Sequence, residues 1–341
     1  MLKRISALLI SSSLLLPAIA QSADDEVVVY SSRKAHLIEP LFEAYEKKTG
    51  VNVRFITDKA APLIARLQAE GERSPADMLI TVDAGNLWQA ANKGVLASVE
   101  SEQLESNVPQ HLQDPQNRWF GLSVRSRTMV YSTERVQPSE LSSYEDLADP
   151  KWKGRLCLRT SKKVYNQSLV AMMIARHGEA KTQQIIQGWV ANLATKPFSN
   201  DTKAMKAVAA GQCDVTIVNT YYFGRLQKKD PNAALAIFWP NQPGSAKAGQ
   251  DTGVHVNISG AGITQYAPHR AAAVKLLEWL SSDEAQQSFA GRNQEYPVNP
   301  VTKLDPQVAS WGTFIGDSIN VIKAGELQTT AVKLMDRAGY K

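Results

Sequence analysis

The stretch VVVYSSRKAHLIEPLFEAYEKKTGVNVRFI, residues 27–56, decides the fold class of this chain. It opens with a β-branched and aromatic run at 27–30, which predicts a buried strand. Apolar residues then recur at helical spacing from His36 until Gly50, where the helix is expected to end. Residues 51–56 predict a second strand. This order of strand, helix and strand indicates an α/β fold with a parallel sheet covered by helices.

The rest of the chain predicts further strands and helices in a less regular order. Residues 119–124, 128–132 and 254–263 are predicted to be extended, with little helix between the first two segments. We expect the segments near 124–132 and 254–263 to cross between two lobes and to form a hinge beside a ligand cleft. Other helices are expected over residues 61–71, 85–93, 168–177, 179–193, 203–210, 271–281 and 284–290 and after 306, and other strands over 76–81 and 213–218.

The length and composition of the chain favour two globular lobes. At 341 residues the chain is long for one simple core, since a domain averages about 150 residues. We place the N-terminal lobe in residues 24–127 plus 252–302 and the C-terminal lobe in residues 128–251 plus 303–341. The formal net charge is only +5 and the basic residues are scattered, so no nucleic-acid partner is expected.

The first residues predict export from the cytoplasm. Two positive residues precede an apolar run that ends in the A-x-A pattern at 18–20, which is typical of a signal peptide over residues 1–23. Cleavage is expected after Ala20 or Ala23. The run is too short for a membrane span, which needs roughly 20 apolar residues. We therefore expect a periplasmic protein without stable membrane insertion, with an uncleaved N-terminal anchor as the alternative.

The two cysteines of the chain, Cys157 and Cys213, favour a disulfide. An even number of cysteines in an oxidising compartment usually pairs. Each cysteine lies in a short apolar run that predicts a strand, and the bond could close if these strands are neighbours. Two buried free thiols are the alternative. Two cysteines alone make a poor site for a soft metal, which usually takes four nitrogen or sulfur ligands.

Three parts of the chain resemble the type 2 periplasmic binding proteins. These are residues 29–33 before the helix that ends at Gly50, residues 76–81 with 94–96, and residues 143–147 with 150–154. The match covers nearly all of the mature chain, but these segments identify only the superfamily. The resemblance implies an α/β fold with two lobes, each a central mixed sheet flanked by helices, joined by two hinge strands.

A narrower resemblance lies in residues 211–222. A strand followed by Asn219-Thr220-Tyr221-Tyr222, with Tyr165 upstream, closely resembles the ferric-iron-binding branch, the bacterial relatives of transferrin. The resemblance implies that a monomer captures Fe(III) in the periplasm and delivers it to an inner-membrane iron ABC permease. It also implies that Tyr165, Tyr221 and Tyr222 are the metal ligands.

The chemistry of tyrosine suits such a role. Ferric iron is a hard cation that favours anionic oxygen donors. A phenol has an ordinary pKa of about 10, but a bound cation stabilises the phenolate directly. Three phenolates would balance the charge of the ion. The alternative for each tyrosine is an ordinary packing role. Adjacent residues of a strand point to opposite faces, so Tyr221 and Tyr222 can reach one ion only where the backbone turns.

The first lobe departs from the best-known members of this branch. Many of them carry a histidine ligand just after the first strand, where this chain has Lys34, and some use a glutamate where this chain has Val82. The protein would then supply three ligands to an octahedral ion. A bidentate anion such as carbonate or bicarbonate, with or without water, could fill the remaining positions. Residues expected to support the ligands are Asp83, which could also replace a ligand, Lys34 and Ser161.

An anion in this position needs positive partners. The resemblance places Arg33 and Arg125 toward the cleft, and a guanidinium offers a planar fork that suits an oxyanion. Arg127 competes with Arg125, because residues two apart in a strand share a face. A surface ion pair is the alternative role for either arginine. Because of the resemblance, we expect Arg33 and Arg125 to bind the anion.

Other functions need other residues. An organic anion, a polyamine or a thiamine-like cofactor could occupy the same kind of cleft. An enzyme is not expected, because the chain has no G-x-S-x-G, no H-E-x-x-H and no nucleotide-binding loop. With five histidines in the whole chain, a histidine-based catalytic site also has few candidates.

Overall fold

The computed structural model describes residues 26–247 and 249–341, and the expected signal peptide at 1–23 lies outside them. The first predicted elements are present as β1 (Glu26–Ser31), α1 (Ala35–Thr49) and β2 (Asn52–Thr57). Strands β1 and β2 pair in parallel, as the strand–helix–strand pattern predicts. Helix α1 ends at Gly50, whose φ of 77° is left-handed and whose N–H closes the last turn on Glu46.

The strands are hydrogen-bonded in the order β2-β1-β3-β8-β4-β6-β5, and β7 also pairs with β4. The β1–β2, β1–β3 and β5–β6 pairs are parallel, whereas β3–β8, β4–β8, β4–β6 and β4–β7 are antiparallel. The sheet is therefore mixed. The bounds of the other strands are β3 (Met78–Val82), β4 (Phe120–Ser132), β5 (Leu156–Cys157), β6 (Val215–Asn219), β7 (Leu235–Phe238) and β8 (Val256–Ile263).

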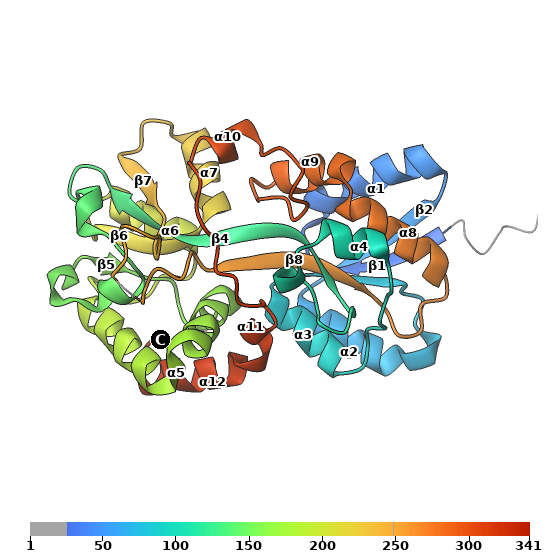
Figure 1. The fold of residues 1–341 in the computed structure, drawn as a ribbon, viewed down its shortest axis with the longest axis horizontal. Helices are drawn as coiled ribbons and strands as arrows, with labels where there is room; N and C mark the ends of the chain where they lie inside the picture. The colour runs from blue at the N-terminus through green and yellow to red at the C-terminus, as the bar shows by residue number, and fades with distance from the viewer. Residues whose placement is uncertain (1–25, 248) are drawn as a thin grey trace, which may run out of the picture.

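Strand β4 connects the two halves of the molecule (Figure 1). Residues 120–126 pair with β8, and residues 127–132 pair with β6 and β7. The two extended segments predicted at 119–124 and 128–132 are thus one continuous strand, and every residue of it is buried. Strand β8 lies beside β4 in the middle of the molecule and pairs with β3 on its other side.

Two main hydrophobic cores lie on either side of this connection. The first contains residues of β1, β3, β8 and the first half of β4, packed against α1, α2, α3, α8 and α9. The second contains residues of the second half of β4, β6, α5 and α12. A smaller third core lies against α6 and α7 and contains both cysteines. We call the elements around the first core the first lobe and those around the other two the second lobe.

The boundaries between the two lobes that we predicted at 127/128 and 251/252 stay a prediction. Three residues of the tail that we assigned to the C-terminal lobe, Val308, Val321 and Ile322, belong to the first core.

The bounds of the helices are α2 (Ala60–Glu70), α3 (Ala84–Asn92), α4 (Glu102–Asn107), α5 (Val164–Asn192), α6 (Asp201–Ala209), α7 (Thr220–Lys229), α8 (Arg270–Ser281), α9 (Asp283–Gly291), α10 (Pro306–Ala309), α11 (Lys323–Glu326) and α12 (Gln328–Arg337), with short 3₁₀ turns at Gly71–Arg73, Gln110–Leu112, Pro138–Glu140, Glu145–Ala148 and Pro150–Trp152.

Two features of the second lobe match the sequence closely. Helix α5 is interrupted at Gly178, whose φ of 75° is not helical, so it corresponds to the two predicted helices at 168–177 and 179–193. The predicted disulfide is confirmed: Cys157 and Cys213 are bonded, with their Cα atoms 5.9 Å apart. The bond joins the end of β5 to the turn before β6, across 56 residues of sequence.

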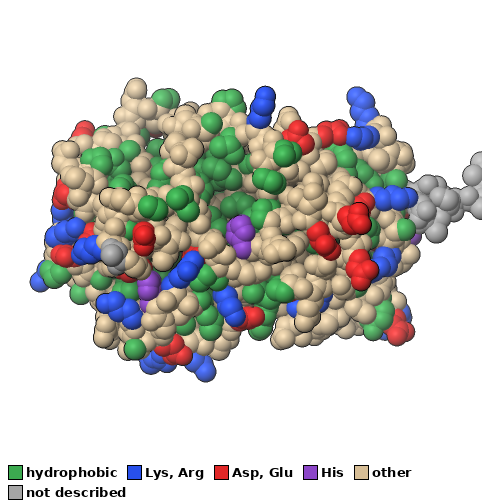
Figure 2. All heavy atoms as spheres, viewed as in Figure 1, with side chains coloured by type: hydrophobic (Ala, Val, Ile, Leu, Met, Phe, Trp, Pro, Cys, Tyr) green, Lys and Arg blue, Asp and Glu red, His purple; other side chains and the backbone are tan. Residues whose placement is uncertain are grey.

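The surface carries charges of both signs. On the face shown in Figure 2, basic and acidic side chains are interspersed, and most of them lie toward the two ends of the molecule. Among the residues that the structure describes, none of the helices has the length and apolar character needed to cross a membrane.

Candidate metal centre

The tyrosine pair lies where a strand turns into a helix, as the sequence predicts. Strand β6 ends at Asn219 and α7 begins at Thr220, so Tyr221 and Tyr222 occupy the first turn of that helix. Their ring centroids are 4.5 Å apart, with the planes tilted by 40°. Tyr221 is 5% exposed, and Tyr222 is half-buried. The turn of the backbone therefore brings both phenols to one side of the second lobe.

Tyr165 meets this pair from another helix. It lies in the first turn of α5, and the Arg125 guanidinium is 5.2 Å from the centre of its ring. Together the three tyrosines line a cleft of about 210 Å³. The remaining lining residues are Ser32, Arg33, Lys34, Leu37, Val82, Asn293 and Glu295 from the first lobe and Arg125 and Arg225. The cleft thus lies between the lobes, with the three phenols on one wall.

Burial keeps the free phenols protonated. It raises the pKa of Tyr221 well above its ordinary value, and the neighbouring Tyr165 and Tyr222 reinforce the effect, while Arg125 opposes it. Burial also raises the pKa of Tyr165, again against the influence of Arg125. Both phenols are neutral at pH 7 without a cation. A metal bound here would have to displace their protons, so its affinity would fall in acid.

Arg33 is a buried cation with unused donors. Its Nη1 donates to Glu295 Oε2 at 3.0 Å and to Ser259 Oγ at 2.6 Å. Its Nε and Nη2 have no hydrogen-bond partner within the described part of the chain. Arg33 lines the cleft, and because an unpaired buried donor costs free energy, these donors favour an acceptor that can reach them.

Glu295 balances part of this positive charge. It also accepts hydrogen bonds from Ser123 Oγ at 2.5 Å and from Asn293 Nδ2 at 2.6 Å. Burial alone would raise the pKa of Glu295, but Arg33, Arg125 and the hydrogen bonds outweigh burial, so the pKa lies below its ordinary value. Glu295 is ionised at neutral pH and forms a buried ion pair with Arg33.

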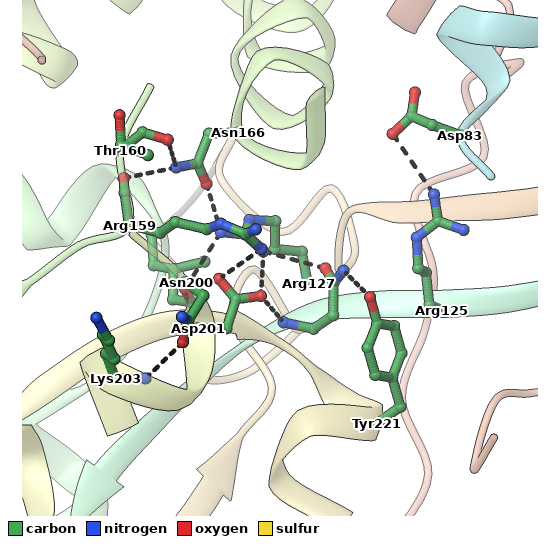
Figure 3. A network of polar contacts seen from close by, with 12 residues as sticks. Asp83, Arg125, Arg127, Arg159, Thr160, Asn166, Asn200, Asp201, Lys203 and Tyr221 are labelled. Carbon is green, nitrogen blue, oxygen red and sulfur yellow. Dashed lines mark hydrogen bonds and ion pairs between the residues drawn. The ribbon is translucent and has the colours of Figure 1, made fainter. Parts of the chain in front are cut away.

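The structure separates Arg125 from Arg127, although their spacing in a strand would place both on one face. Arg125 lines the cleft, with its Nη2 3.5 Å from Asp83 Oδ2. Arg127 pairs with Asp201 at 3.2 Å inside the second lobe, as Figure 3 shows. The difference arises because β4 changes its partner strand between them: Arg125 lies opposite a residue of β8, and Arg127 lies opposite Asn219 of β6.

Asp83 lies behind the cleft and does not line it. It precedes α3 with a φ of 84°, and its carboxylate accepts from Gly85 N–H at 3.0 Å, Ser168 Oγ at 2.8 Å and Asn257 Nδ2 at 3.0 Å. Complete burial raises its pKa despite these donors and the guanidinium of Arg125. Since Ser168 belongs to α5, the carboxylate links the first lobe to the second.

Lys34 and Ser161, the other two residues predicted to support the metal ligands, lie apart from each other. Lys34 is exposed and lines the cleft at the residue just before α1. Ser161 does not line the cleft, and its backbone N–H donates to the carbonyl of Lys341 at 3.1 Å. The structure therefore brings Lys34, Arg33 and Arg125 together with the tyrosines and leaves Ser161 outside.

Three cleft residues were missed by the sequence reasoning. The Arg225 guanidinium is 5.1 Å from the ring centre of Tyr221 and 5.7 Å from that of Tyr222, and it donates to Asn293 Oδ1 across the cleft. Arg225 could have been found, because residues four apart share one face of a helix. Asn293 and Glu295 carry no such signal, because they follow α9 at a distant point in the chain.

Two lobes, a strand that runs through both and a cleft lined by ionisable side chains define a substrate-binding protein of the two-lobed α/β class. The chain belongs to the family of bacterial extracellular solute-binding proteins, whose sequence model matches residues 73–315.

Curated relatives share most of the chain. It is 43% identical over 322 residues to iron uptake protein A1 of Synechocystis sp., and the matched region covers 93% of this chain and 88% of the relative. It is 27% identical over 337 residues to the major ferric iron-binding protein of Neisseria meningitidis serogroup B, which covers 93% of both chains.

Solved structures agree with these relatives. The Trichodesmium FutA structure in complex with iron and citrate has a TM-score of 0.88 and 43% identity, covering 93% of this chain and all of that one. The open ferric iron-binding protein A of Mannheimia haemolytica has a TM-score of 0.85 and 37% identity, covering 93% and 99%. These findings confirm the resemblance to the ferric-iron-binding branch and the type 2 periplasmic binding protein fold.

Proposed function

We propose that this protein captures ferric iron in the periplasm and delivers it to an inner-membrane ABC permease. The observation that carries the proposal is the meeting of three phenols, Tyr165, Tyr221 and Tyr222, in one interlobe cleft. Relatives that share most of the chain are named for iron uptake or ferric iron binding, and one solved structure holds iron with citrate.

The three tyrosines would bind the ion as phenolates. Each loses its proton on binding, and together they neutralise the charge of Fe(III). All three lie in the first turn of a helix, α5 or α7. The positive end of a helix dipole stabilises an anion there by about 0.3–1 kcal/mol. The helix starts thus lower the cost of forming phenolates in a buried site.

A small anion would complete the coordination of the metal. Three protein ligands leave room for a bidentate carbonate or bicarbonate. The free Nε and Nη2 of Arg33 and the guanidinium of Arg125 would hold it on the first-lobe side. Lys34 adds positive charge at the edge of the cleft.

Capture and release would follow from the two-lobed architecture. The ion binds to the second lobe, and the first lobe closes over it with its arginines. Contacts across the cleft such as Arg225 with Asn293 then hold the closed form. The closed protein docks on the permease as a monomer. No catalytic step is part of this proposal, and the relatives carry the names of uptake and binding proteins.

An organic anion is the second candidate cargo. The observation in its favour is the buried guanidinium of Arg33, whose unused donors would suit a carboxylate without any metal. Metal-free protein would then bind the anion as tightly as iron-loaded protein does. A polyamine or a thiamine-like cofactor has less support, because Glu295 is already paired with Arg33.

Iron content and colour test the proposal directly. Purified protein is loaded with ferric nitrilotriacetate, freed of excess iron and examined by metal analysis and visible absorption. Equimolar iron with a phenolate-to-iron charge-transfer band is expected. Colourless iron-loaded protein would contradict the tyrosine ligands. Tight binding of an organic anion by protein that takes up no iron would favour the second candidate.

A further inference from the structure

Asn219 makes a hydrogen bond that the proposed iron site does not explain. It is the last residue of β6 and is 2% exposed. Its Nδ2 donates to the phenol oxygen of Tyr221 at 3.1 Å, and its Oδ1 accepts from Arg127 Nη1 at 3.1 Å. One side-chain amide therefore connects a buried guanidinium to one of the three phenols.

The orientation of this amide follows from the chemistry of arginine. The oxygen and nitrogen of an asparagine amide are often indistinguishable, but a guanidinium has only donors. The atom that faces Arg127 must be Oδ1, so the NH₂ group must face Tyr221. Asn219 also precedes α7, where an asparagine oxygen usually accepts from the helix N–H groups. It makes no such capping bond. The side chain serves the Arg127–Tyr221 connection instead.

Arg127 is itself held firmly in place. It donates to Asp201 Oδ2 at 3.2 Å, to Asn166 Oδ1 and to the carbonyl of Ile217 at 3.3 Å. The backbone N–H of Asn219 donates to the same Asp201 oxygen at 3.3 Å. Figure 3 shows this network inside the second lobe, with Tyr221 at one end and Arg125 with Asp83 apart from it. The amide that faces Tyr221 therefore has little freedom to rotate.

We infer that Asn219, oriented by Arg127, is a positioning residue for Tyr221: its amide donates a hydrogen bond to the Tyr221 oxygen and stabilises it as the phenolate that binds iron. This inference rests on the proposed function. A hydrogen bond to the charged form of an acid favours that form. The phenolate oxygen has lone pairs enough for one metal bond and one hydrogen bond.

The neutral amide has an advantage over a direct cation. Of the three cleft tyrosines, Tyr221 is the most buried, so water stabilises its phenolate least. A guanidinium at the phenol oxygen would stabilise the anion but would also repel the ferric ion beside it. The amide presents a donor to the oxygen and keeps the charge of Arg127 one residue further away. Arg225, in comparison, lies over the ring of Tyr221.

Two substitutions at Asn219 test the inference. Asn219→Leu removes the donor at similar volume, and Arg127 keeps its other three partners. Asn219→Asp keeps an acceptor for Arg127 and places a second anion beside the phenolate. Asn232→Asp, on an exposed loop of the same lobe, is the control for added charge. Each protein is loaded with ferric nitrilotriacetate, and its iron affinity and visible spectrum are compared with those of the wild type.

The expected results form a series. Iron affinity falls about tenfold in Asn219→Leu and about a hundredfold in Asn219→Asp, the range for losing a hydrogen bond to a charged group. The charge-transfer band moves to longer wavelength in the same order, because a phenolate without its donor gives up electron density more readily. Asn232→Asp matches the wild type in both measurements.

Two outcomes would overturn the inference. One is an unchanged spectrum and affinity in both Asn219 variants. The other is weaker binding with an unshifted band in Asn219→Leu, which would indicate a structural role alone. If Tyr221→Phe weakens binding while both Asn219 variants match the wild type, this inference fails and the proposed function stands. If Tyr221→Phe itself binds iron normally with an unchanged band, the proposed ligand set fails first.

Discussion

At the scale of single residues, the cleft brings tyrosines and charged side chains from distant parts of the chain together. Tyr165, Tyr221 and Tyr222 line one wall, and Arg33 and Arg125 are among the residues that line the rest. The unpaired Nε and Nη2 of Arg33 are the observation behind the proposed anion. Each of these roles depends on a few atoms, so single substitutions can test it.

Tyr222→Phe should weaken iron binding by more than about a hundredfold, since even residues that support a metal ligand contribute ten- to a hundredfold. The variant keeps the ring and its contact with Tyr221 and removes only the donor oxygen. Competition with nitrilotriacetate measures the affinity, and the visible band should shrink. Tyr266→Phe, an exposed tyrosine outside the cleft, is the matched control. Equal affinity and an equal band in Tyr222→Phe would refute its role as a ligand.

Arg33→Lys should reduce the dependence of iron binding on bicarbonate. Lysine keeps a charge beside Glu295 but loses the planar fork that an oxyanion prefers. Bicarbonate should increase the iron affinity of both proteins, and the factor of increase should be about ten times larger for the wild type than for the variant. Arg66→Lys, on an exposed helix face, is the control. A wild-type protein that is indifferent to bicarbonate would exclude this anion.

At the scale of elements, the arrangement depends on β4 and on two helix starts. Strand β4 carries Arg125 to the cleft and Arg127 into the second lobe, and His255 precedes β8 beside them. The backbone N–H of His255 donates to Tyr144 Oη at 3.1 Å, and its carbonyl accepts from Arg127 N–H at 3.0 Å. These bonds hold the backbone of His255, whose buried imidazole lines a small pocket together with Arg125 and Arg127.

The stability of the iron-free protein should depend on pH through His255. Burial lowers its pKa from 6.5 to about 3, and Arg127 and Arg125 add to the effect. The unfolded chain therefore binds a proton between these values when the folded chain does not. Folding stability from the neutral imidazole is complete above pH 6.5 and falls by about 1.4 kcal/mol per pH unit as the pH decreases toward 3.

His255→Gln isolates this contribution from that of the carboxylates. The difference between the unfolding free energies of the wild type and the variant should fall by about 2 kcal/mol between pH 7 and pH 5. Urea denaturation at the two pH values measures it. Parallel pH profiles for the two proteins would show that His255 does not remain neutral in the folded state.

At the scale of the whole molecule, several polar contacts join the lobes in addition to the continuous strand β4. Asp83 of the first lobe accepts from Ser168 of α5, and Arg225 of α7 donates to Asn293 of the first lobe. Gln328, in the tail, contacts Gln89 on α3 and Gln167 on α5. Polar contacts of this kind can break and reform with modest changes in free energy, as a hinge-closing protein requires.

Ser168→Ala should shift the iron-free protein toward an open form. The substitution removes one hydrogen bond between the lobes, worth about 1 kcal/mol, or roughly a fivefold change in the equilibrium. Small-angle scattering should report a larger radius of gyration, and saturating iron should restore the wild-type value. Ser310→Ala, on the surface of the tail, is the control. An unchanged radius in Ser168→Ala would mean that this contact does not bias closure.

Local patterns in the sequence predicted much of the architecture. The valine run before α1, the stop at Gly50 and the break at Gly178 depend on neighbours a few residues away, so periodicity and turn chemistry are enough to find them. The disulfide followed from the compartment and the even number of cysteines. The tyrosine pair was singled out by the resemblance of residues 211–222 to the ferric-iron-binding branch, and its predicted place at the end of a strand is where the structure has it.

Contacts between distant segments determine how these parts combine into a cleft. The tertiary structure places Arg125 in the cleft and Arg127 beside Asp201, because β4 changes partners between them. In the structure, Glu295 pairs with Arg33 although the two are far apart in the chain, and Asp83 lies behind the cleft. Most strands and helices and the chemical types available could be predicted from the sequence, since these depend on local spacing. The contacts that pair one charge with another depend on distant segments meeting, and no local pattern records that.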